Sequence, residues 1–525
     1  MKKTRKMRFL LTALAMVILL TSACGAKNEK TSGDGTYDLS SYPIKTDITL
    51  SYFVPLRAES AGMIDNYSET FCAQELEKRT GVKIEYIHPA VGQQNEMLSL
   101  LIASNELPDI VQNNWGSYSG GLSAAVKENV VIPLNDYKEY APALFKLYEE
   151  NPSWNKQAKN DDGYYAGFPD IAGSSILRMS AGPVIRADWL RELGLSAPET
   201  IAEWEEVLTA FKDKKGVAIP FSTTSIDHLY PMFGAHNGSF IENNEYKFGW
   251  TQPEMKVAVT HLNDWFNKGL LDKNLFAIDK KSIDAQVLTG QTGATITSGG
   301  DIGRYMNAAE DPNFELIGVR YPTYEKGKVN DCMNVSHAVS SLVSSVTTRC
   351  KYPELAVKML DWFYTEEGHI FANFGVEGVT FNYDENNEPK YSDVIMKNPD
   401  GLSMMESLAL HTKAGTSGPY ETSVGYIMQY YNLPQQQKAL EEWQIGFDES
   451  TAKRALPVSR TPEESAESSD IMSEVIKQGQ MRLSRFITGQ EPIDNFDAYV
   501  EEMEKIGLSK ALKAYTSALA RYNNR

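Results

Sequence analysis

The chain has 525 residues, a formal net charge of −18, 42% hydrophobic residues and 10% aromatic residues. The acidic surplus disfavours nucleic acid and other polyanions as partners, because their recognition requires clustered lysine and arginine. A chain of this length exceeds what one hydrophobic core usually covers, so we expect two lobes or domains.

The first segment of the chain is basic and then apolar. Five lysine and arginine residues lie between Lys2 and Arg8, and an apolar run from Phe9 to Leu20 follows them. The run is shorter than the roughly 20 residues that cross a bilayer. This pattern is typical of a secretory signal. Without its five basic residues, the net charge changes from −18 to −23.

The residues from Leu20 to Gly25, Leu-Thr-Ser-Ala-Cys-Gly, resemble the lipobox of bacterial lipoproteins. That family usually has leucine three places before the cysteine, where this chain has Thr21. The resemblance implies a signal peptide over residues 1–23 and acylation of Cys24. The lipid would hold the protein at the extracytoplasmic face of the cell membrane without spanning it. The alternative is a soluble secreted protein in which Cys24 is not modified.

The segment after Cys24 is polar. Residues 27–42 are rich in Ser, Gly, Lys and Asp and contain few apolar residues. Such a composition predicts a flexible tether, which we place at residues 24–45.

Strand and helix patterns alternate from residue 48 onward. Residues 48–54 have a strand pattern, and residues 66–80 have a helical pattern that Gly81 ends. A strand is predicted at 82–86, a helix at 95–104 and a strand at 108–111. This alternation predicts a parallel sheet flanked by helices.

Several segments resemble one protein family. These are ELEKRTGVKIEYI (Glu75–Ile87), LSLLIASNELPDIV (Leu98–Val111), a Tyr-Ala-Gly-Phe-Pro strand ending at Pro169, and the region 348–381 with Phe-Gly-Val-Glu-Gly. Together they resemble the family 1 extracellular solute-binding proteins of ABC importers, which mostly serve carbohydrates. The resemblance implies an α/β, two-lobe, periplasmic-binding-protein-like type II fold. Each lobe would be a mostly parallel sheet flanked by helices, with a C-terminal helical extension.

The same resemblance implies where each lobe lies in the chain. Lobe 1 is expected at residues 46–168 and 323–378, and lobe 2 with the C-terminal helices at residues 169–322 and 379–525. The predicted hinges are at Gly167–Ile171 and Arg320–Pro322.

The resemblance also implies a function. A monomeric lipoprotein of this family would capture a sugar or oligosaccharide in the cleft between its lobes and deliver it to an ABC transporter permease. The lobes would close around the ligand, and no cofactor is expected.

Sugars bind through aromatic rings and through side chains that exchange hydrogen bonds with hydroxyl groups. In the stretches that the resemblance places at the cleft, Trp115 is the candidate for stacking, although a packing role is an equal alternative. Glu377 could contact ligand or only hold its turn. The full set of predicted ligand-binding residues is Arg57, Asn114, Trp115, Asp170, Asp227, His228, Ser298, Gly299, Gly300, Asp301 and Glu377.

The common catalytic motifs are absent from the sequence. It contains no phosphate-binding loop, no G-x-S-x-G and no H-E-x-x-H, and no two of its seven histidines lie within four residues. We therefore expect no catalytic residues and no metal site. Asp109, Asp170, Asp301 and Glu377 could still supply the two carboxylates of a glycosidase. A membrane-tethered glycan-active enzyme and a peptide-binding or sensor lipoprotein of the same fold remain the alternatives.

Three cysteines follow Cys24, at positions 72, 332 and 350. An odd number allows at most one disulfide. Cys332 and Cys350 are closest in sequence, but separate buried thiols are an equally good interpretation.

Overall fold

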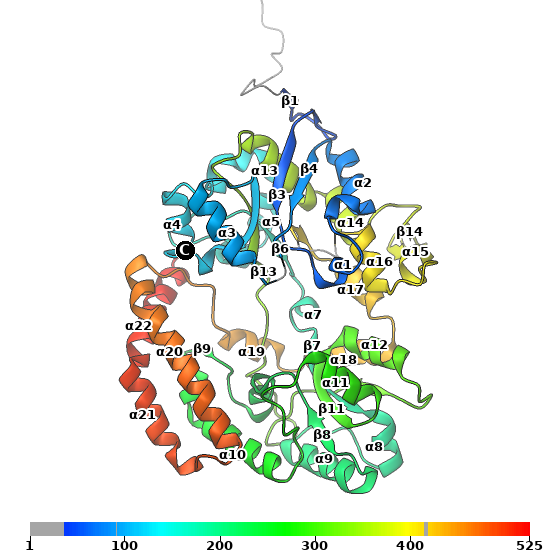
Figure 1. Cartoon of the computed structure of the whole chain (residues 1–525), viewed down its shortest axis with the longest axis vertical. Coiled ribbons are helices and arrows are strands. Elements are labelled where there is room, and N and C mark those ends of the chain that lie inside the picture. The colour runs from blue at the N-terminus through cyan, green and yellow to red at the C-terminus, as the bar shows by residue number, and fades with distance from the viewer. Residues whose placement is uncertain (1–35, 91, 414–417) are drawn as a thin grey trace, which may run out of the picture.

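The computed structural model describes residues 36–90, 92–413 and 418–525, which form two lobes (Figure 1). Lobe 1 is built on a six-stranded sheet and lobe 2 on a four-stranded sheet. The predicted α/β two-lobe architecture is therefore confirmed. The signal segment and Cys24 lie outside the described residues.

The sheet of lobe 1 has the strand order β16-β6-β13-β5-β3-β4. Only β13 runs against the others among these six strands, so the predicted, mostly parallel arrangement is confirmed. The strands are β3 (Thr49–Phe53), β4 (Lys83–Ile87), β5 (Ile110–Asn114), β6 (Phe168–Ile171), β13 (Val339–Val346) and β16 (Tyr420–Glu421).

The sheet of lobe 2 has the order β12-β7-β11-β8, and β7 is its reversed strand. Its strands are β7 (Ala181–Arg186), β8 (Ile219–Ser222), β11 (Thr292–Ser298) and β12 (Leu316–Gly318). Three two-stranded ribbons lie outside the two sheets. They pair β1 (Tyr37–Asp38) with β2 (Lys45–Thr46), β9 (Ser239–Glu242) with β10 (Glu245–Phe248), and β14 (Phe381–Tyr383) with β15 (Pro389–Tyr391).

Both faces of the lobe 1 sheet are buried. Tyr52 packs in one core with Leu50 and Ile110, whereas its neighbour Phe53 packs in a second core with Val111. Successive strand residues point to opposite faces, so buried apolar residues on both faces require helices on both sides. The helices in the lobe 1 part of the chain are α1 (Ala58–Ala61), α2 (Phe71–Thr80), α3 (Gln94–Ser104), α4 (Gly121–Lys127), α5 (Pro142–Glu150), α6 (Pro152–Ala158), α13 (Pro353–Asp361), α14 (Glu366–Phe374), α15 (Asp393–Met396), α16 (Met404–His411) and α17 (Val424–Tyr430).

Helix α9 (Ile201–Lys215) of lobe 2 begins with a capping box. The Glu203 amide donates to Thr200 Oγ1 (3.2 Å), and the Thr200 amide donates to Glu203 Oε2 (3.0 Å). Two amides without a helical partner are thereby satisfied. The stripe that includes Trp204 and Phe211 is buried, as its helical spacing predicts. The other helices of this region are α7 (Ser175–Arg178), α8 (Ala187–Leu193), α10 (Pro253–Asn267), α11 (Lys280–Leu288), α12 (Gly299–Ala308), α18 (Pro434–Trp443) and α19 (Phe447–Lys453).

The chain ends in three helices, α20 (Pro462–Ile487), α21 (Phe496–Ile506) and α22 (Leu508–Asn523). Helix α20 packs on α10 of lobe 2 and on α22. Figure 1 shows these helices beside lobe 2, with their upper ends and the C-terminus close to α4 of lobe 1. The C-terminal extension therefore reaches from one lobe to the other.

Two strands lie in a different lobe from the one predicted. Strands β6 and β16, which fall within the ranges predicted for lobe 2 (169–322 and 379–525), are hydrogen-bonded into the sheet of lobe 1. Helix α16 packs on α2 of the same lobe. The pairing of β6 with β13 also excludes a hinge within Phe168–Ile171, so the chain leaves lobe 1 only after β6.

The last part of the predicted tether is packed instead of extended. Strands β1 and β2 pair, and Tyr37 and Ile44 are 5% and 2% exposed. The Tyr42 hydroxyl donates to the Lys358 carbonyl (2.5 Å). The apolar groups of these three residues pack in the core of lobe 1. The free energy gained by this burial outweighs the effect of the polar residues around them.

Cys72, Cys332 and Cys350 are buried free thiols. The disulfide between Cys332 and Cys350 that the sequence left open is therefore not formed. Within the described ranges, no helix is both long and apolar enough to cross a membrane.

Candidate functional site

Three predicted residues of lobe 1 lie at one edge of its sheet. Strands β3, β5 and β6 are parallel, so their carboxyl ends meet at that edge. Arg57 follows β3, Asn114 is the last residue of β5, and Asp170 is the second-last residue of β6. Ligands of open α/β sheets bind outside the carboxyl ends of the strands.

The predicted residues of lobe 2 lie at the matching edge of the second sheet. Strands β8 and β11 are parallel, and their carboxyl ends are followed by the short helix Ile226–His228 and by α12. Asp227 lies in the first of these, and Ser298 to Asp301 begin the second. In Figure 1, the end of β6 and the start of β13 in lobe 1 point toward β7 and α12 in lobe 2. The two candidate edges therefore face each other.

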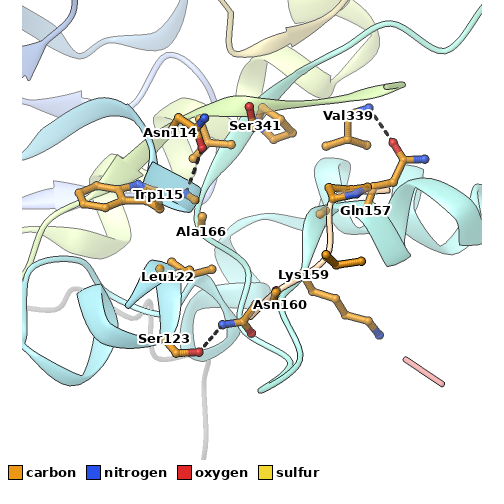
Figure 2. Close-up of a pocket in the computed structure, with 18 of the residues that line it drawn as sticks. Asn114, Trp115, Leu122, Ser123, Gln157, Lys159, Asn160, Ala166, Val339 and Ser341 are labelled. Carbon is orange, nitrogen blue, oxygen red and sulfur yellow. Dashed lines mark hydrogen bonds between the residues drawn. The ribbon is translucent and has the colours of Figure 1, made fainter. Parts of the chain in front are cut away.

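A cavity of about 380 Å³ lies against the lobe 1 edge (Figure 2). Its wall includes the end of β5, the start of β6 and the start of β13, and residues of α4 and α6 complete it. Two hydrogen bonds fix polar groups in this wall. Asn160 Nδ2 donates to Ser123 Oγ (2.8 Å), and the Val339 amide donates to Gln157 Oε1 (3.3 Å). Amide and hydroxyl groups thus line the cavity in defined orientations.

The opposite wall comes from the far end of the chain. Residues 457–460 and Ser465, which lead into and begin α20, line the same cavity. Asp161 of lobe 1 holds this wall in place, because it accepts hydrogen bonds from Arg521 Nε (2.7 Å) and from Arg525 Nε (2.8 Å). Arg525 Nη2 donates in turn to Ser459 Oγ (2.8 Å). The cavity is therefore enclosed by segments about 300 residues apart.

The charged side chains that line the cavity are Lys159 and Arg460. Among its described lining residues there is no carboxylate. Arg460 donates to Ser468 Oγ (2.6 Å), and its guanidinium lies 4.6 Å from the Tyr515 ring centroid. Neutral polar groups consequently dominate the surface that a ligand would meet.

Trp115 lines the cavity but is 2% exposed. Its indole N–H donates to Ser345 Oγ (2.7 Å), and its ring packs against Tyr118 with centroids 5.9 Å apart. Buried tryptophan N–H groups normally find such a partner. In this structure Trp115 is a packing residue with one edge at the cavity. Its stacking on a sugar stays a prediction. Asn114 also lines the cavity, and its Oδ1 accepts the Gly116 amide (3.0 Å).

Arg57 and Asp170 lie close to each other. Burial raises the pKa of the Asp170 carboxyl, while a hydrogen bond from Thr422 Oγ1 (3.0 Å) and the charge of Arg57 lower it. The neighbouring residue Pro169 lines the cavity. Asp170 therefore lies beside the cavity, and the charge of Arg57 acts on its carboxyl group.

Asp227 and His228 are adjacent titratable residues in lobe 2. Burial raises the pKa of Asp227 and lowers that of His228, and each residue's charge opposes the shift of the other. His228 Nδ1 lies 3.1 Å from Thr223 Oγ1. Both residues are partly buried, as groups on the wall of a cleft would be.

Polar groups of the segment from Ser298 to Asp301 already have hydrogen-bond partners within the protein. The Gly299 amide donates to the Ser180 carbonyl (3.0 Å), and the Gly300 amide faces the Tyr431 hydroxyl. Gly299 and Gly300 were predicted as ligand-binding residues, but in this structure their amides already have partners within the protein. Ser298 Oγ accepts the Asp301 amide (3.2 Å) and so caps α12.

Asp301 is held by an ion network. Its carboxylate accepts hydrogen bonds from Thr297 Oγ1 (2.5 Å), Arg304 Nη2 (2.7 Å) and Lys280 Nζ (3.1 Å). Burial alone would raise the pKa of Asp301, but these partners lower it. A carboxylate with these partners positions α12 and has little capacity left for a ligand.

Glu377 lies apart from both edges. It is exposed and lines a separate depression of about 370 Å³ with Arg79, Glu367 and Tyr383. Its structural role is a bridge pairing with Phe381 within the turn. The structure does not bring Glu377 together with the other predicted residues.

Several lining residues were not predicted from the sequence. They are Ser123, Gln157, Lys159, Asn160, Ser340, Ser341 and Arg460. None of them belongs to a recognisable motif. The polar, non-alternating start of β13 (Val-Ser-Ser) is the signal that could have indicated an exposed strand end.

Comparisons with known proteins identify the family. The family model described as "Bacterial extracellular solute-binding protein" matches residues 60–370, more than half of the chain. The "Fructooligosaccharide ABC transporter substrate-binding protein FusA" of Streptococcus pneumoniae serotype 4 is 26% identical over 97% of each chain. "Lipoprotein LipO" of Bacillus subtilis is 24% identical, over 71% of this chain and 73% of that protein.

Solved structures share the fold. The structure of S. pneumoniae FusA in complex with kestose has a TM-score of 0.73 and 23% identity, covering 91% of this chain and 100% of that chain. The structure of the alginate-binding protein AlgQ2 without calcium ion has a TM-score of 0.72 and 22% identity, covering 90% and 98%. With two lobes, facing strand edges and a family match over residues 60–370, the chain belongs to the bacterial extracellular solute-binding proteins, which bind a solute without converting it.

Proposed function

We propose that this protein captures an oligosaccharide between its lobes and delivers it to the permease of an ABC transporter. Membership of the solute-binding family supports the capture role. The similarity to FusA, a fructooligosaccharide ABC transporter substrate-binding protein, extends over 97% of both chains and supports the ligand class. The identity of the sugar is left to experiment.

The observation that carries the proposal is the composition of the cavity between lobe 1 and the segment 457–465. A hydroxyl-rich, uncharged ligand needs neutral groups that can both donate and accept hydrogen bonds. Side-chain amides at Asn114, Gln157 and Asn160 and hydroxyls at Ser340 and Ser341 line the cavity and meet this need.

Closure would extend the site from this cavity to both strand edges. Arg57 and Asp170 in lobe 1, and Asp227 and His228 in lobe 2, are the proposed further contacts. A ligand that bridges the two edges binds the closed form better than the open form, and this difference in affinity drives closure. The closed form would then be the one that the permease recognises.

Attachment to the membrane is the remaining part of the proposal. Acylation of Cys24 would keep the protein at the outer face of the cell membrane beside its permease. The similarity to LipO, a lipoprotein, supports this anchor. Labelling of cells with a palmitate analogue should mark the wild-type protein and leave the Cys24→Ala variant unmarked.

The ligand class is tested by a thermal-shift screen with neutral oligosaccharides, uronic-acid oligosaccharides and peptides, followed by calorimetry. A ligand at 100 times its Kd adds about 2.7 kcal/mol of stability. We expect stabilisation by an oligosaccharide, recovered chemically intact after incubation. Stabilisation by peptides alone, or cleavage of the bound sugar by the purified protein, would refute the proposal.

The location of the site is tested with a blocking variant. Ser341 is exposed and lines the cavity, so Ser341→Trp should weaken binding of the sugar found in the screen at least tenfold. Thr49→Trp is the matched control, because Thr49 is an exposed strand residue at the amino end of the same sheet. Equal affinities of the two variants would place the ligand elsewhere.

A further inference from the structure

Three metal-ligating side chains from distant parts of the sequence converge beside the link between the lobes. They are His236, Asp331 and Cys332, whose ligand atoms all lie within 4.8 Å of one another. His236 follows the short helix Tyr230–Phe233 of lobe 2, whereas Asp331 and Cys332 lie in the segment that joins β12 to β13. The histidine spacing in the sequence could not predict this group, because nearly 100 residues separate its members.

The contacts of Asp331 and Cys332 are compatible with a bound metal ion. Cys332 Sγ donates to Asp331 Oδ1 (3.3 Å), so a metal ion could replace the thiol proton between these two atoms. The other oxygen, Asp331 Oδ2, is paired with Lys453 Nζ (2.6 Å) and could keep that partner.

A cavity of about 310 Å³ adjoins the group and contains a second, independent indication of a ligand. His236, Cys332 and His337 all line it. His337 Nδ1 is buried and, within the described chain, has no hydrogen-bond partner. The ring's other nitrogen faces the Ala455 carbonyl as a donor, so Nδ1 is the acceptor. A buried acceptor without a donor is costly, and a metal-bound water in this cavity would supply that donor.

We propose that His236, Asp331 and Cys332 bind a divalent transition-metal ion of the zinc type, with a water molecule as the fourth ligand. Imidazole, carboxylate and thiolate are all zinc ligands, and the thiolate disfavours calcium and magnesium. Binding converts the Cys332 thiol to a thiolate and releases one proton. Bond lengths of about 2.0 to 2.3 Å bring tetrahedral ligand atoms to roughly 3.5 Å apart, so small side-chain rotations complete the site.

The site would tie the linking segment to lobe 2. Its ligands come from the loop at His236 and from the segment between β12 and β13, which connects the two sheets. Metal binding would therefore fix one end of a segment that has to bend when the lobes close. This inference is independent of the sugar ligand.

The test is a Co²⁺ titration of the purified, reduced protein, followed by competition with Zn²⁺. We expect one equivalent of Co²⁺ to produce a thiolate-to-cobalt charge-transfer band, which Zn²⁺ abolishes. Cys332→Ser should remove the band, and His236→Ala should weaken Zn²⁺ binding at least tenfold. Cys350→Ser is the matched control, because Cys350 is a buried thiol beside the Asp109 carboxylate and outside the group of His236, Asp331 and Cys332, and it should keep the band.

A gain of affinity separates metal binding from a folding defect. Lys453→Met removes a positive charge 2.6 Å from the Asp331 carboxylate and should tighten Zn²⁺ binding several-fold. A misfolded variant would not bind more tightly. The absence of a charge-transfer band in the wild type, or a band that persists in Cys332→Ser, would overturn the proposal.

Discussion

Arg186 and Asp188 form a buried ion pair in lobe 2, and removing one partner should destabilise that lobe strongly. Both side chains are 4% exposed, and Arg186 Nε donates to Asp188 Oδ1 (2.8 Å). Leaving one charge of such a pair buried alone costs about 3 to 5 kcal/mol. We expect Arg186→Met to show this loss, because the Asp188 carboxylate then keeps only a long contact to the Glu315 amide (3.5 Å).

Replacing both partners should restore most of the stability. The Arg186 guanidinium lies 4.2 Å from the Trp189 ring centroid and 4.4 Å from that of Phe314, so a methionine at 186 would lie against two aromatic rings. Buried ion pairs that are replaced by packed apolar residues are often neutral in stability. The double variant Arg186→Met/Asp188→Leu should therefore lie within about 2 kcal/mol of the wild type.

The assay is thermal and urea unfolding of the single and double variants. A loss of 3 to 5 kcal/mol lowers the Tm of a lobe of this size by about 6 to 20 °C. The control is the exposed pair Arg191–Glu315, with arginine and glutamate side chains 63% and 23% exposed, for which Arg191→Met should cost about 1 kcal/mol or less. Losses that add in the double variant would refute the reasoning, because the cost would then not arise from an unpaired buried charge.

Three further predictions follow from buried groups. Gly182→Ala places a Cβ 2.4 Å from the fully buried Trp443 ring and should lower the unfolding free energy, measured in urea, by about 1 to 3 kcal/mol. An unchanged unfolding free energy would mean that this ring moves freely. Burial raises the pKa of Asp361 to about 6, although hydrogen bonds from the first amides of α5 oppose the shift. The folded state then holds the proton to a higher pH than the unfolded chain does, so the unfolding free energy should fall by about 2 kcal/mol between pH 4 and pH 7. Asp361→Asn should remove this slope, and an unchanged pH profile would contradict the assignment. Trp115→Phe removes the donor to Ser345 and should lower the unfolding free energy by about 1 to 3 kcal/mol. A double-mutant cycle with Ser345→Ala measures the contribution of this hydrogen bond, and additive losses would show that it contributes nothing.

The sequence predicts the local elements and the fold class well, because their signals are local. The helix predicted at 95–104 is α3 (Gln94–Ser104), and the bounds of the strand predicted at 108–111 lie two to three residues from those of β5 (Ile110–Asn114). Thr200 and Glu203 form the predicted capping box. Each of these depends on residues within one turn or one strand of each other.

The lobe boundaries and the site depend on contacts between distant residues, which local patterns do not encode. Strand β16 is two residues long, so only its pairing with β6 assigns it to lobe 1. The glycines at 299 and 300 suggest exposed amides. In the fold, however, these amides have hydrogen-bond acceptors in Ser180 and Tyr431, which come from other parts of the chain. The approximate location at the strand ends could be predicted, whereas the partners of each side chain could not.

The anchoring of Arg525 affects how this protein should be handled in transport assays. Its side chain is 4% exposed and bonds to Asp161 and Ser459 at the wall of the cavity. A purification tag or fluorescent reporter fused after this residue would disturb that wall. The resulting loss of binding could be misread as a weak intrinsic affinity. The exposed turn at Asn243 and Asn244, between β9 and β10, is the safer place to attach one.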